Sequence, residues 1–541
     1  MRLCLPFSCD HAEPEVGSSV KSVDGRASDP RTRNATGRFE IDRCRVELGS
    51  LIFLRLGRGT HDSFLINAIS LDRPIISAWE LGRMKSTAAT PSPKSPTSLS
   101  DVDDVLVKAV SQHHGDPDFW SSKTRDRTDS AHCIFQYPAM MVPLVQRRLL
   151  EAVLAAQPGI ASLFDPFVGS GTSLVSGMHF SLDVFGADIN PLAVLISRVR
   201  TSRKVEFTIG SIGAEIVRRA RSDRRSSIET NLANRDKWFT TTALDELSRL
   251  RRAIRTCENL WARRFLWVTL AETVRLTSND RTSTYKLHAR PTDEIATRSV
   301  SPFDVFADLA SRNADSFAFF RKKLRDAGAL RNARYCAVSE VVLADSRENP
   351  EEWTNLAPFD LMMTSPPYGD NLTTVTYGQH SYLPLNWIDL GDIDARVDAD
   401  LLSTTLEIDR RSLGGRDAVA FRDEERLFAA SLTLKRFAET LPAKPHDART
   451  RLMRFYRDFE TSLVAMIGRM RQNAYMIWTV GNRNIAGKQV PTDAILSELM
   501  ENLRCRTVKT LTRRIHHKRM PDRNASSATM REEKILLLRK L

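Results

Sequence analysis

Two short strings of residues carry the chemistry in this sequence. The first runs from Asp165 to Thr172 and reads Asp-Pro-Phe-Val-Gly-Ser-Gly-Thr, and the second, Ser365 to Tyr368, reads Ser-Pro-Pro-Tyr. The glycines of the first string suit a nucleotide-like cofactor, because the backbone there can approach a ligand without a Cβ in between. The second string offers acceptors and an aromatic ring, which suit a flat base that carries an amino group. The fold must therefore bring two distant segments together.

The glycine string has the surroundings that a cofactor loop needs. A short apolar run at 161–164 predicts a buried strand before it, and a second apolar run predicts a helix after it. Gly169 and Gly171 allow a tight turn, and the helix N-terminus offers unpaired N–H groups. The lysine of a phosphate-binding loop is missing. A predicted strand at 183–189 ends near Asp188, about 20 residues beyond the glycines, where a carboxylate can accept hydrogen bonds from ribose hydroxyls. The alternative is a purely structural turn.

The second string stands where ligands bind in open α/β sheets. Leu361 to Met363 predicts a buried strand, and Ser365 follows at its C-terminal end. Consecutive prolines lack N–H groups and hold a rigid turn whose carbonyls stay unpaired. If the Ser365 hydroxyl and the Pro366 carbonyl accept the hydrogens of an exocyclic amino group, the nitrogen is biased towards a tetrahedral geometry with a lone pair. Tyr368 can then stack on the ring, at a typical ~1–3 kcal/mol per base. The alternative is a surface turn with a packed tyrosine.

The two strings together resemble those of S-adenosylmethionine-dependent DNA amino-methyltransferases, most closely those that modify the N4 of cytosine. The resemblance covers roughly residues 130–541 and includes segments around Tyr137, Asp188 and Asp345. It implies the following cofactor-binding residues: Tyr137, Pro138, Asp165, Pro166, Phe167, Gly169, Gly171, Thr172, Asp188, Asn190 and Asp345. It implies that the catalytic residues are Ser365, Pro366, Pro367 and Tyr368.

The resemblance implies direct transfer of a methyl group from S-adenosyl-L-methionine to the N4 of a cytosine in double-stranded DNA. Positioning alone can contribute ~7–11 kcal/mol to such a reaction. A base inside a duplex cannot reach the pocket, so the target nucleotide must be flipped out. The family further implies a restriction-modification system with a cognate restriction endonuclease as partner. Adenine-N6 methylation is the nearest alternative, because the same geometry presents either amino group. An RNA-modifying enzyme and a DNA-binding regulator without turnover are further alternatives.

No residue pattern indicates a covalent nucleophile or a metal site. None of the seven cysteines follows a proline, as the nucleophile of a carbon-5 cytosine methyltransferase typically does. The cysteines also lack the spacing of zinc ligands, and their scatter suits a reducing cytoplasm. His516 and His517 are neighbours, which on a strand face opposite sides. We therefore expect no metal there, but a basic segment in which Lys518 and Arg519 contact DNA.

These motifs, in their strand-turn-helix surroundings, predict an α/β fold. We expect a doubly wound, Rossmann-like sheet of the class I methyltransferase type, with an inserted, mainly helical domain and a disordered N-terminal region. The 541 residues exceed what one core normally covers. We predict four regions: a poorly ordered extension and Pro/Ser linker at 1–100, the first part of the core with the cofactor site at 101–200, an inserted helical domain at 201–335, and the second part of the core with the catalytic motif at 336–541.

The Pro/Ser/Thr stretch at 86–100 predicts a disordered linker. Because Met84 stands directly before it, one hypothesis is that translation begins at Met84. The alternative is a small, poorly ordered domain at the N-terminus.

The segment 201–335 is far longer than the usual ~2–6-residue connection between a helix and a strand, so it should be a domain. It contains apolar residues at helical spacing and several clusters of arginines, and its polar stretch 277–286 is rich in groups that reach phosphates or base edges. We predict target recognition by this insertion, with Arg281 and Lys286 as DNA contacts. The alternative is a helical cap that covers the core.

Two further segments give weaker signals. A second insertion, at about 394–449, is charged and loop-like, and no function is evident from its residues. Asp370 and Asn371 lie just past Tyr368, and we interpret them as polar residues on a loop surface; the alternative is that either assists departure of a proton or touches the flipped base.

Composition agrees with a nucleic-acid partner. The chain has 79 Lys and Arg against 66 Asp and Glu, a net charge of +13, and neutralising phosphates drives non-specific affinity for DNA. Many basic proteins bind no DNA, so the charge is only supportive. No apolar run approaches the ~20 residues of a membrane span, and no signal-peptide pattern is present. We expect a cytoplasmic protein without a membrane partner, whose oligomeric state is unknown.

Overall fold

The computed structural model describes residues 99–113, 119–121, 131–205, 209–371, 374–415, 424–442, 448–515 and 531–541. These residues belong to one compact unit, Ile76–Leu541. The predicted N-terminal extension, the linker before residue 99 and the hypothetical start at Met84 lie outside the described residues. Lys518 and Arg519 lie outside them as well.

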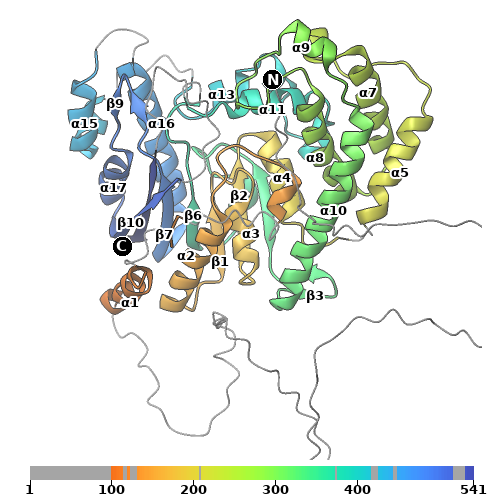
Figure 1. Ribbon diagram of the computed structural model, residues 1–541. Coiled ribbons are helices and arrows are strands. Elements are labelled where there is room, and N and C mark those ends of the chain that lie inside the picture. The colour runs from red at the N-terminus through yellow and green to blue at the C-terminus, as the bar shows by residue number, and fades with distance from the viewer. Residues whose placement is uncertain are drawn as a thin grey trace, which may run out of the picture. The chain divides into compact units, whose positions relative to one another are not determined.

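A seven-stranded sheet forms the centre of the unit, in the order β10-β11-β7-β6-β1-β2-β5 (Figure 1). The strands are β1 (Ser162–Asp165), β2 (Asp183–Asp188), β5 (Ser339–Leu343), β6 (Phe359–Thr364), β7 (Met470–Val480), β10 (Cys505–Arg514) and β11 (Glu532–Lys540). The five strands from β5 to β7 pair in parallel, and β11 runs antiparallel to both of its neighbours. From β1 the chain builds outward to β2 and β5, and it then returns to the other side of β1 with β6. The order of the strands therefore reverses between β1 and β6, which is where open α/β sheets bind ligands.

Helices cover both faces of the sheet (Figure 1). They are α1 (Leu99–Ser111), α2 (Pro143–Ala156), α3 (Thr172–Met178), α4 (Pro191–Arg200), α5 (Ile209–Ser222), α6 (Arg235–Trp238), α7 (Thr241–Arg255), α8 (Leu260–Thr277), α9 (Thr292–Thr297), α10 (Pro302–Asp326), α11 (Tyr377–Leu385), α12 (Leu390–Ile393), α13 (Glu407–Arg411), α14 (Glu424–Ala430), α15 (Leu432–Glu439), α16 (Ala448–Gly468) and α17 (Thr492–Asn502). Short 3₁₀ helices are η2 (Ala131–Ile134), η3 (Glu351–Trp353) and η4 (Ala399–Leu402), and two small hairpins are β3–β4 (Leu330–Arg331 with Arg334–Tyr335) and β8–β9 (Asn484–Ile485 with Lys488–Gln489).

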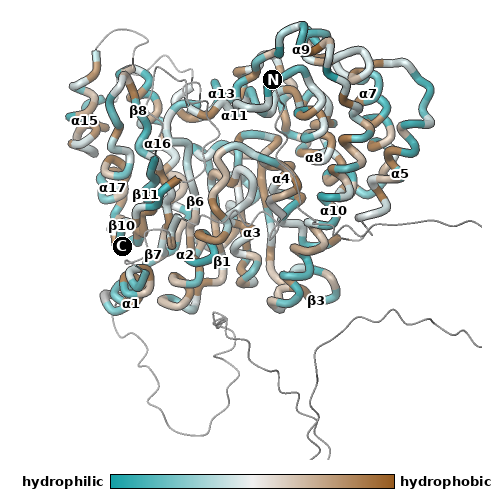
Figure 2. The backbone as a smooth tube through the Cα atoms, in the orientation of Figure 1, coloured by the Kyte–Doolittle hydropathy of each residue, from teal (hydrophilic) through white to brown (hydrophobic). Residues whose placement is uncertain are grey.

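Alternating side chains of the strands build two hydrophobic cores. Leu163 of β1 and Met363 of β6 belong to the core that includes α2, α3, α4 and the helices of the long insertion. Phe164 and Met362, their neighbours in sequence, belong to the core that includes α16 and α17. Successive residues of a strand point to opposite faces, so central strands that are buried on both sides read as continuous apolar runs. Figure 2 shows hydrophobic residues concentrated along the central strands and the adjoining helices.

The doubly wound, Rossmann-like sheet expected from the sequence is confirmed. The insertion between β2 and β5 is mainly helical and supplies α5 to α10. Its helices α8 and α10 share the hydrophobic core with α4, so the insertion is packed onto the sheet layer. The domain boundaries drawn from the sequence stay a prediction. Among the described residues, no helix is both long enough and apolar enough to cross a membrane.

Candidate active site

The two strings lie side by side at the C-terminal edge of the sheet. Strands β1 and β6 pair in parallel with Phe164 opposite Met362, so the residues that follow each strand leave the sheet next to one another. A hydrogen bond of 2.6 Å from Thr364 Oγ1 to Asp165 Oδ1 joins the two strand ends. Segments almost 200 residues apart in sequence thus meet at the point where the strand order reverses.

Asp165 is fully buried and holds the glycine loop from behind. Its carboxylate accepts hydrogen bonds from Thr364, from Phe167 N at 3.1 Å and from the Ser173 hydroxyl at the start of α3. Burial raises the pKa of Asp165 from 3.8 to about 6, against the lowering effect of these donors. Asp165 does not line the pocket described below, so the structure places this predicted cofactor residue where it shapes the loop.

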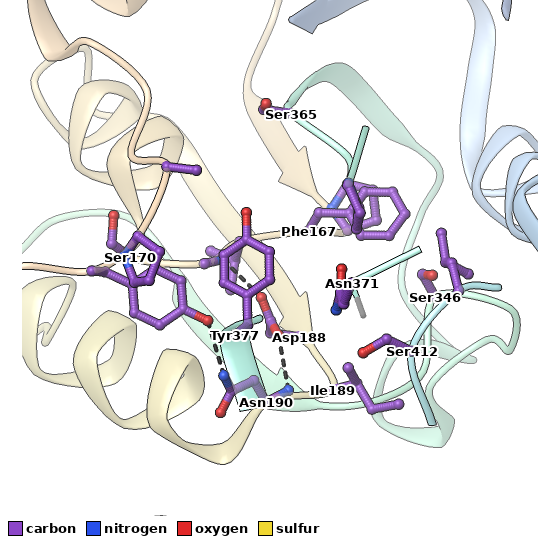
Figure 3. Close-up of a pocket in the computed structure, with 18 of the residues that line it drawn as sticks. Phe167, Ser170, Asp188, Ile189, Asn190, Ser346, Ser365, Asn371, Tyr377 and Ser412 are labelled. Carbon is purple, nitrogen blue, oxygen red and sulfur yellow. Dashed lines mark hydrogen bonds between the residues drawn. The ribbon is translucent and has the colours of Figure 1, made fainter. Parts of the chain in front are cut away.

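A pocket that is partly open to solvent lies above the ends of β1, β2, β5 and β6 (Figure 3). The predicted site residues that line it are Tyr137, Pro138, Pro166, Phe167, Gly169, Thr172, Asp188, Asn190, Asp345, Ser365 and Pro367. Those that do not line it are Asp165, Gly171, Pro366 and Tyr368. The structure therefore brings most of the residues predicted from both strings into one cavity.

The glycine loop adopts a conformation that side chains would disfavour. Gly169 and Gly171 have φ angles of 48° and 78°, in the left-handed region. A Cβ at Gly171 would lie 3.0 Å from Ser197 Oγ of α4, which in turn donates a 2.8 Å hydrogen bond to the carbonyl of Gly169. Asp188 Oδ2 accepts a 2.9 Å hydrogen bond from the Gly169 N–H. The loop is thereby fixed between β2 and α4.

Asp188 and Asn190 form the wall of the pocket beside the glycine loop. Burial raises the pKa of Asp188 from 3.8 to about 6, although its oxygens accept backbone hydrogen bonds. Asn190 caps the N-terminus of α4 by accepting from Leu192 N, and its amide donates to Ser381 Oγ at 2.8 Å. The amide also donates to Tyr137 OH at 3.0 Å (Figure 3). The side chain of Asn190 is thus engaged with protein groups, and it orients the Tyr137 ring that faces the cavity.

Asp345 follows β5 and lines the pocket, but its carboxylate already forms an ion pair with Arg347. Arg347 donates to both of its carboxylate oxygens, at 3.0 and 2.5 Å, and also contacts Asp458 of α16 at 3.4 Å. Asp458 in turn accepts from the backbone N–H of Gly414 at 2.9 Å. This network ties the end of β5 to the second insertion.

The Ser-Pro-Pro-Tyr string presents only part of itself to the cavity. Ser365 and Pro367 line it, whereas the Tyr368 hydroxyl points to Ser365 Oγ at 3.3 Å and donates to Glu533 Oε1 of β11 at 2.9 Å. The pKa of Tyr368 lies well above its usual value because of burial and the adjacent Glu533 carboxylate. The predicted stacking of the Tyr368 ring on a base stays a prediction. The aromatic faces that line the pocket belong to Tyr137, Phe167 and Tyr377.

Asp370 and Asn371 are buried, so their interpretation as surface polarity is wrong. Only 2% of Asp370 and 3% of Asn371 is exposed. Asp370 pairs with Arg483 at 3.1 Å, and Asn371 lines the pocket and hydrogen-bonds the Asp409 side chain. Both partners, Arg483 and Asp409, come from later segments of the chain, so the burial of these two residues depends on how those segments fold back.

The second insertion contributes a wall that sequence reasoning missed. Ile408, Ser412 and Leu413, in and after α13, line the pocket. Asp409 fastens this wall by accepting a 2.8 Å hydrogen bond from Gly378 N, beside Tyr377. Nothing in the charged composition of 394–449 could signal this role, because it depends on how the segment folds back over the sheet.

Arg281 and Lys286 are exposed on a loop next to the pocket. An isolated bridge between Asp280 and Ala289 closes the base of this loop. Its backbone is tied to α11, the helix of Tyr377, because Leu287 N donates to Gln379 Oε1 at 3.1 Å. Among the described residues, neither Arg281 nor Lys286 forms an ion pair.

Most arginines of the other basic clusters are paired within the fold. The ion pairs are Arg218 and Arg219 with Glu215, Arg221 with Asp304, Arg225 and Arg252 with Asp223, Arg251 with Asp389, and Arg263 with Asp392. These clusters stabilise the insertion and its contact with α12, and they leave less positive charge for a partner than the sequence suggests.

Comparisons with known proteins agree with the geometry of this site. The chain is 29% identical over 470 residues to "Type II methyltransferase M.MvaI" of Kocuria varians, covering 82% of this chain and 98% of that protein. The similarity supports a methyltransferase. A shorter match, 32% identical over 80 residues, joins 15% of the chain to 14% of "Type II methyltransferase M.MjaII" of Methanocaldococcus jannaschii. No family model matches the chain.

Two solved structures of the rRNA methyltransferase aviRa from Streptomyces viridochromogenes also match. They cover 77% of this chain and 94% of theirs, with identities of 12% and 11% and TM-scores of 0.28 and 0.29. The similarity to the Type II methyltransferase of Kocuria varians, over most of both chains, supports the S-adenosyl-L-methionine cofactor expected from the sequence.

Proposed function

We propose that the chain is a site-specific DNA methyltransferase that modifies the exocyclic N4 of a cytosine flipped out of the duplex. The observation that carries the proposal is that the two sequence strings, 165–172 and 365–368, lie next to each other at one pocket. Ser365 lines the same cavity as the glycine loop and Asp188, and the strand ends before them are joined by the bond between Thr364 and Asp165. A cofactor pocket and an acceptor group for an amine are thereby contiguous.

The pocket residues fit the nucleoside of S-adenosyl-L-methionine. The Asp188 oxygens accept backbone hydrogen bonds from Gly169 and Asn190, and the carboxylate has further lone pairs for a ribose hydroxyl. Gly169 leaves room for a ligand at the loop, and Phe167 and Tyr137 supply apolar and aromatic walls. When bound, the cofactor supplies a methyl group on a positively charged sulfur.

The chain's own residues would position the amine. The Ser365 hydroxyl and the Pro366 carbonyl accept its hydrogens, which turns the nitrogen lone pair towards the cofactor side of the cavity. The prolines keep these acceptors rigid, so little reorganisation is needed when the base enters. Holding the two reacting groups at near-attack distance is the main contribution that such a site makes.

We further propose that the insertion 201–335 recognises the DNA target. Its exposed loop carries Arg281 and Lys286, and the hydrogen bond from Leu287 to Gln379 ties that loop to the helix of Tyr377 at the pocket. The matched proteins are called Type II methyltransferases, and this supports a role in a restriction-modification system with a cognate endonuclease. The basic segment with Lys518 and Arg519 would add contacts to the DNA backbone.

The test is nucleoside mass spectrometry of duplex DNA incubated with the protein and isotopically labelled S-adenosyl-L-methionine. We expect labelled N4-methylcytosine with the wild type and none with Ser365→Ala. Binding of S-adenosylhomocysteine by the variant, measured by calorimetry, shows that its pocket is intact. Labelled N6-methyladenine would mean that the target base is adenine and not cytosine, with the same mechanism of transfer. No labelled base in DNA of varied sequence, with label in RNA instead, would refute a DNA substrate.

A further inference from the structure

A chain of hydrogen bonds leads from the pocket into the C-terminal hairpin. Tyr368 OH donates to Glu533 Oε1 at 2.9 Å, so its single proton is committed to that carboxylate. The 3.3 Å contact between Ser365 Oγ and Tyr368 OH must then be donated by Ser365. This leaves the Ser365 oxygen with free lone pairs, on a residue that lines the cavity. These hydrogen bonds are therefore all donated in one direction, from Ser365 at the pocket towards Glu533.

Arg513 closes the far end of this chain. Its Nε lies 2.6 Å from Glu533 Oε2, and the two residues are opposite each other in the β10–β11 ladder. Their side chains are 10% and 13% exposed, so the carboxylate is well shielded but still reaches water. A guanidinium at this distance orients the carboxylate.

In the part of the chain that the structure describes, the charged and titratable groups that face Glu533 come from three elements. Arg513 lies on β10, Tyr368 follows β6, and Tyr377 of α11 has its pKa raised first by burial and to a smaller extent by Glu533. Burial also keeps the pKa of Tyr368 high, so this tyrosine does not hold a negative charge. It can pass a proton on only while it receives another.

Methylation of an amino group requires a route for a proton. As the carbon–nitrogen bond forms, the carbon–sulfur bond breaks with its electron pair on sulfur, and the nitrogen becomes positively charged. One N–H bond must then break, with its pair returning to nitrogen. We propose that this proton moves to Ser365 Oγ, that the Ser365 proton moves to Tyr368, and that the Tyr368 proton moves to Glu533. Glu533 ends the step as a neutral acid and later returns the proton to solvent.

This inference rests on the proposed function and adds three roles to it. Ser365 touches the substrate and is catalytic, Tyr368 relays the proton, and Glu533 is the final acceptor. Arg513 acts through Glu533 and is a positioning residue. The proposal also explains why the Tyr368 hydroxyl is directed at β11 and does not line the cavity.

The experiment measures single-turnover methyl transfer with enzyme, duplex DNA and labelled cofactor premixed. Glu533→Gln keeps an acceptor for the Tyr368 hydroxyl but cannot take up a proton, and Tyr368→Phe keeps the ring and the Arg513–Glu533 pair. We expect each variant to be slower by about 100-fold, the lower end of what a general base contributes. Because both substitutions interrupt the same series of hydrogen bonds, the double variant should be no slower than either single variant.

Glu532→Gln is the matched control, because this neighbouring glutamate is exposed and its ion pair, with Lys534, is long at 3.9 Å. It should transfer methyl groups at the wild-type rate. Unchanged affinity for S-adenosylhomocysteine shows that each variant is folded.

Wild-type rates in Glu533→Gln, or additive losses in the double variant, would overturn the proton route. Failure of the proposed function is a separate outcome, because the wild type itself would then leave no labelled base in DNA.

Discussion

Replacing Asp165 with asparagine removes a buried charge behind the glycine loop while keeping the shape of the side chain. Asp165 accepts hydrogen bonds from Thr364, Phe167 and Ser173, and none of it is exposed. Its pKa is nevertheless raised to about 6, because the cost of burying the carboxylate outweighs these donors. The folded protein therefore holds a proton on Asp165 at pH values at which the unfolded chain has released it.

The size of the effect follows from the two pKa values. Moving from 3.8 in the unfolded chain to about 6 in the fold corresponds to about 3 kcal/mol at neutral pH, at ~1.4 kcal/mol per pKa unit. The stability from this group is complete below pH ~4 and is lost as the pH rises through 6, because the unfolded state then binds fewer protons. Between pH 4.5 and 7.5, the free energy of unfolding of the wild type should fall by about 2 kcal/mol relative to Asp165→Asn.

The assay is urea unfolding of both proteins, followed by tryptophan fluorescence at several pH values in this range. Differences between midpoints at equal slope report the relative free energy, and effects from other titrating groups cancel in the comparison. Parallel pH profiles, or a wild type that gains stability over the variant as the pH rises, would refute the reasoning about desolvation.

Three further predictions concern ligands. Gly171→Ala should lower affinity for S-adenosylhomocysteine by about tenfold in calorimetry, because a left-handed residue with a side chain costs ~1–2 kcal/mol and its Cβ meets Ser197; unchanged affinity would mean that the loop is free to relax. The affinity of the wild type should rise as the pH rises through about 6, where Asp188 ionises and becomes a better acceptor, and Asp188→Asn should abolish this dependence; an equal dependence in the variant would assign it to another group. Arg281→Ala combined with Lys286→Ala should weaken DNA binding and flatten its salt dependence by about two units of slope, with cofactor affinity as the control; an unchanged salt slope would exclude both residues as phosphate contacts.

The sequence was sufficient for the fold and for the centre of the site because both depend on local signals. The apolar runs before Gly169 and Ser365 predicted strands, and the glycines and prolines predicted the turns that follow them. The order of strands could be inferred only by resemblance, since the pairing of β1 with β6 spans almost 200 residues. Once that pairing is known, the meeting of the two strings follows from geometry.

The rest of the site could not be read from the sequence because it depends on how distant segments fold back. The Tyr368 hydroxyl donates a hydrogen bond to Glu533, 165 residues later, and no local signal near Tyr368 indicates that partner. Asp409 lies in a charged segment that resembles a loop, and only the fold shows that it is buried against Gly378. The arginine clusters of the insertion similarly looked like a DNA-binding surface until their carboxylate partners were placed.

The long insertion also bears on how the chain folds during its own synthesis. Strand β2 ends at Asp188, and its outer neighbour β5 begins about 150 residues later, at Ser339. Strand β6, which pairs with the other side of β1, comes after β5 in the sequence and is therefore made later still. At ~5–20 residues per second, a ribosome needs on the order of 10–30 s to make the intervening chain. During that interval β1 and β2 expose two hydrophobic sheet edges, which are sites for aggregation. The helices of the insertion are then the first segments able to shield the nascent sheet, and a chaperone requirement should be most acute for nascent chains that end before residue 339.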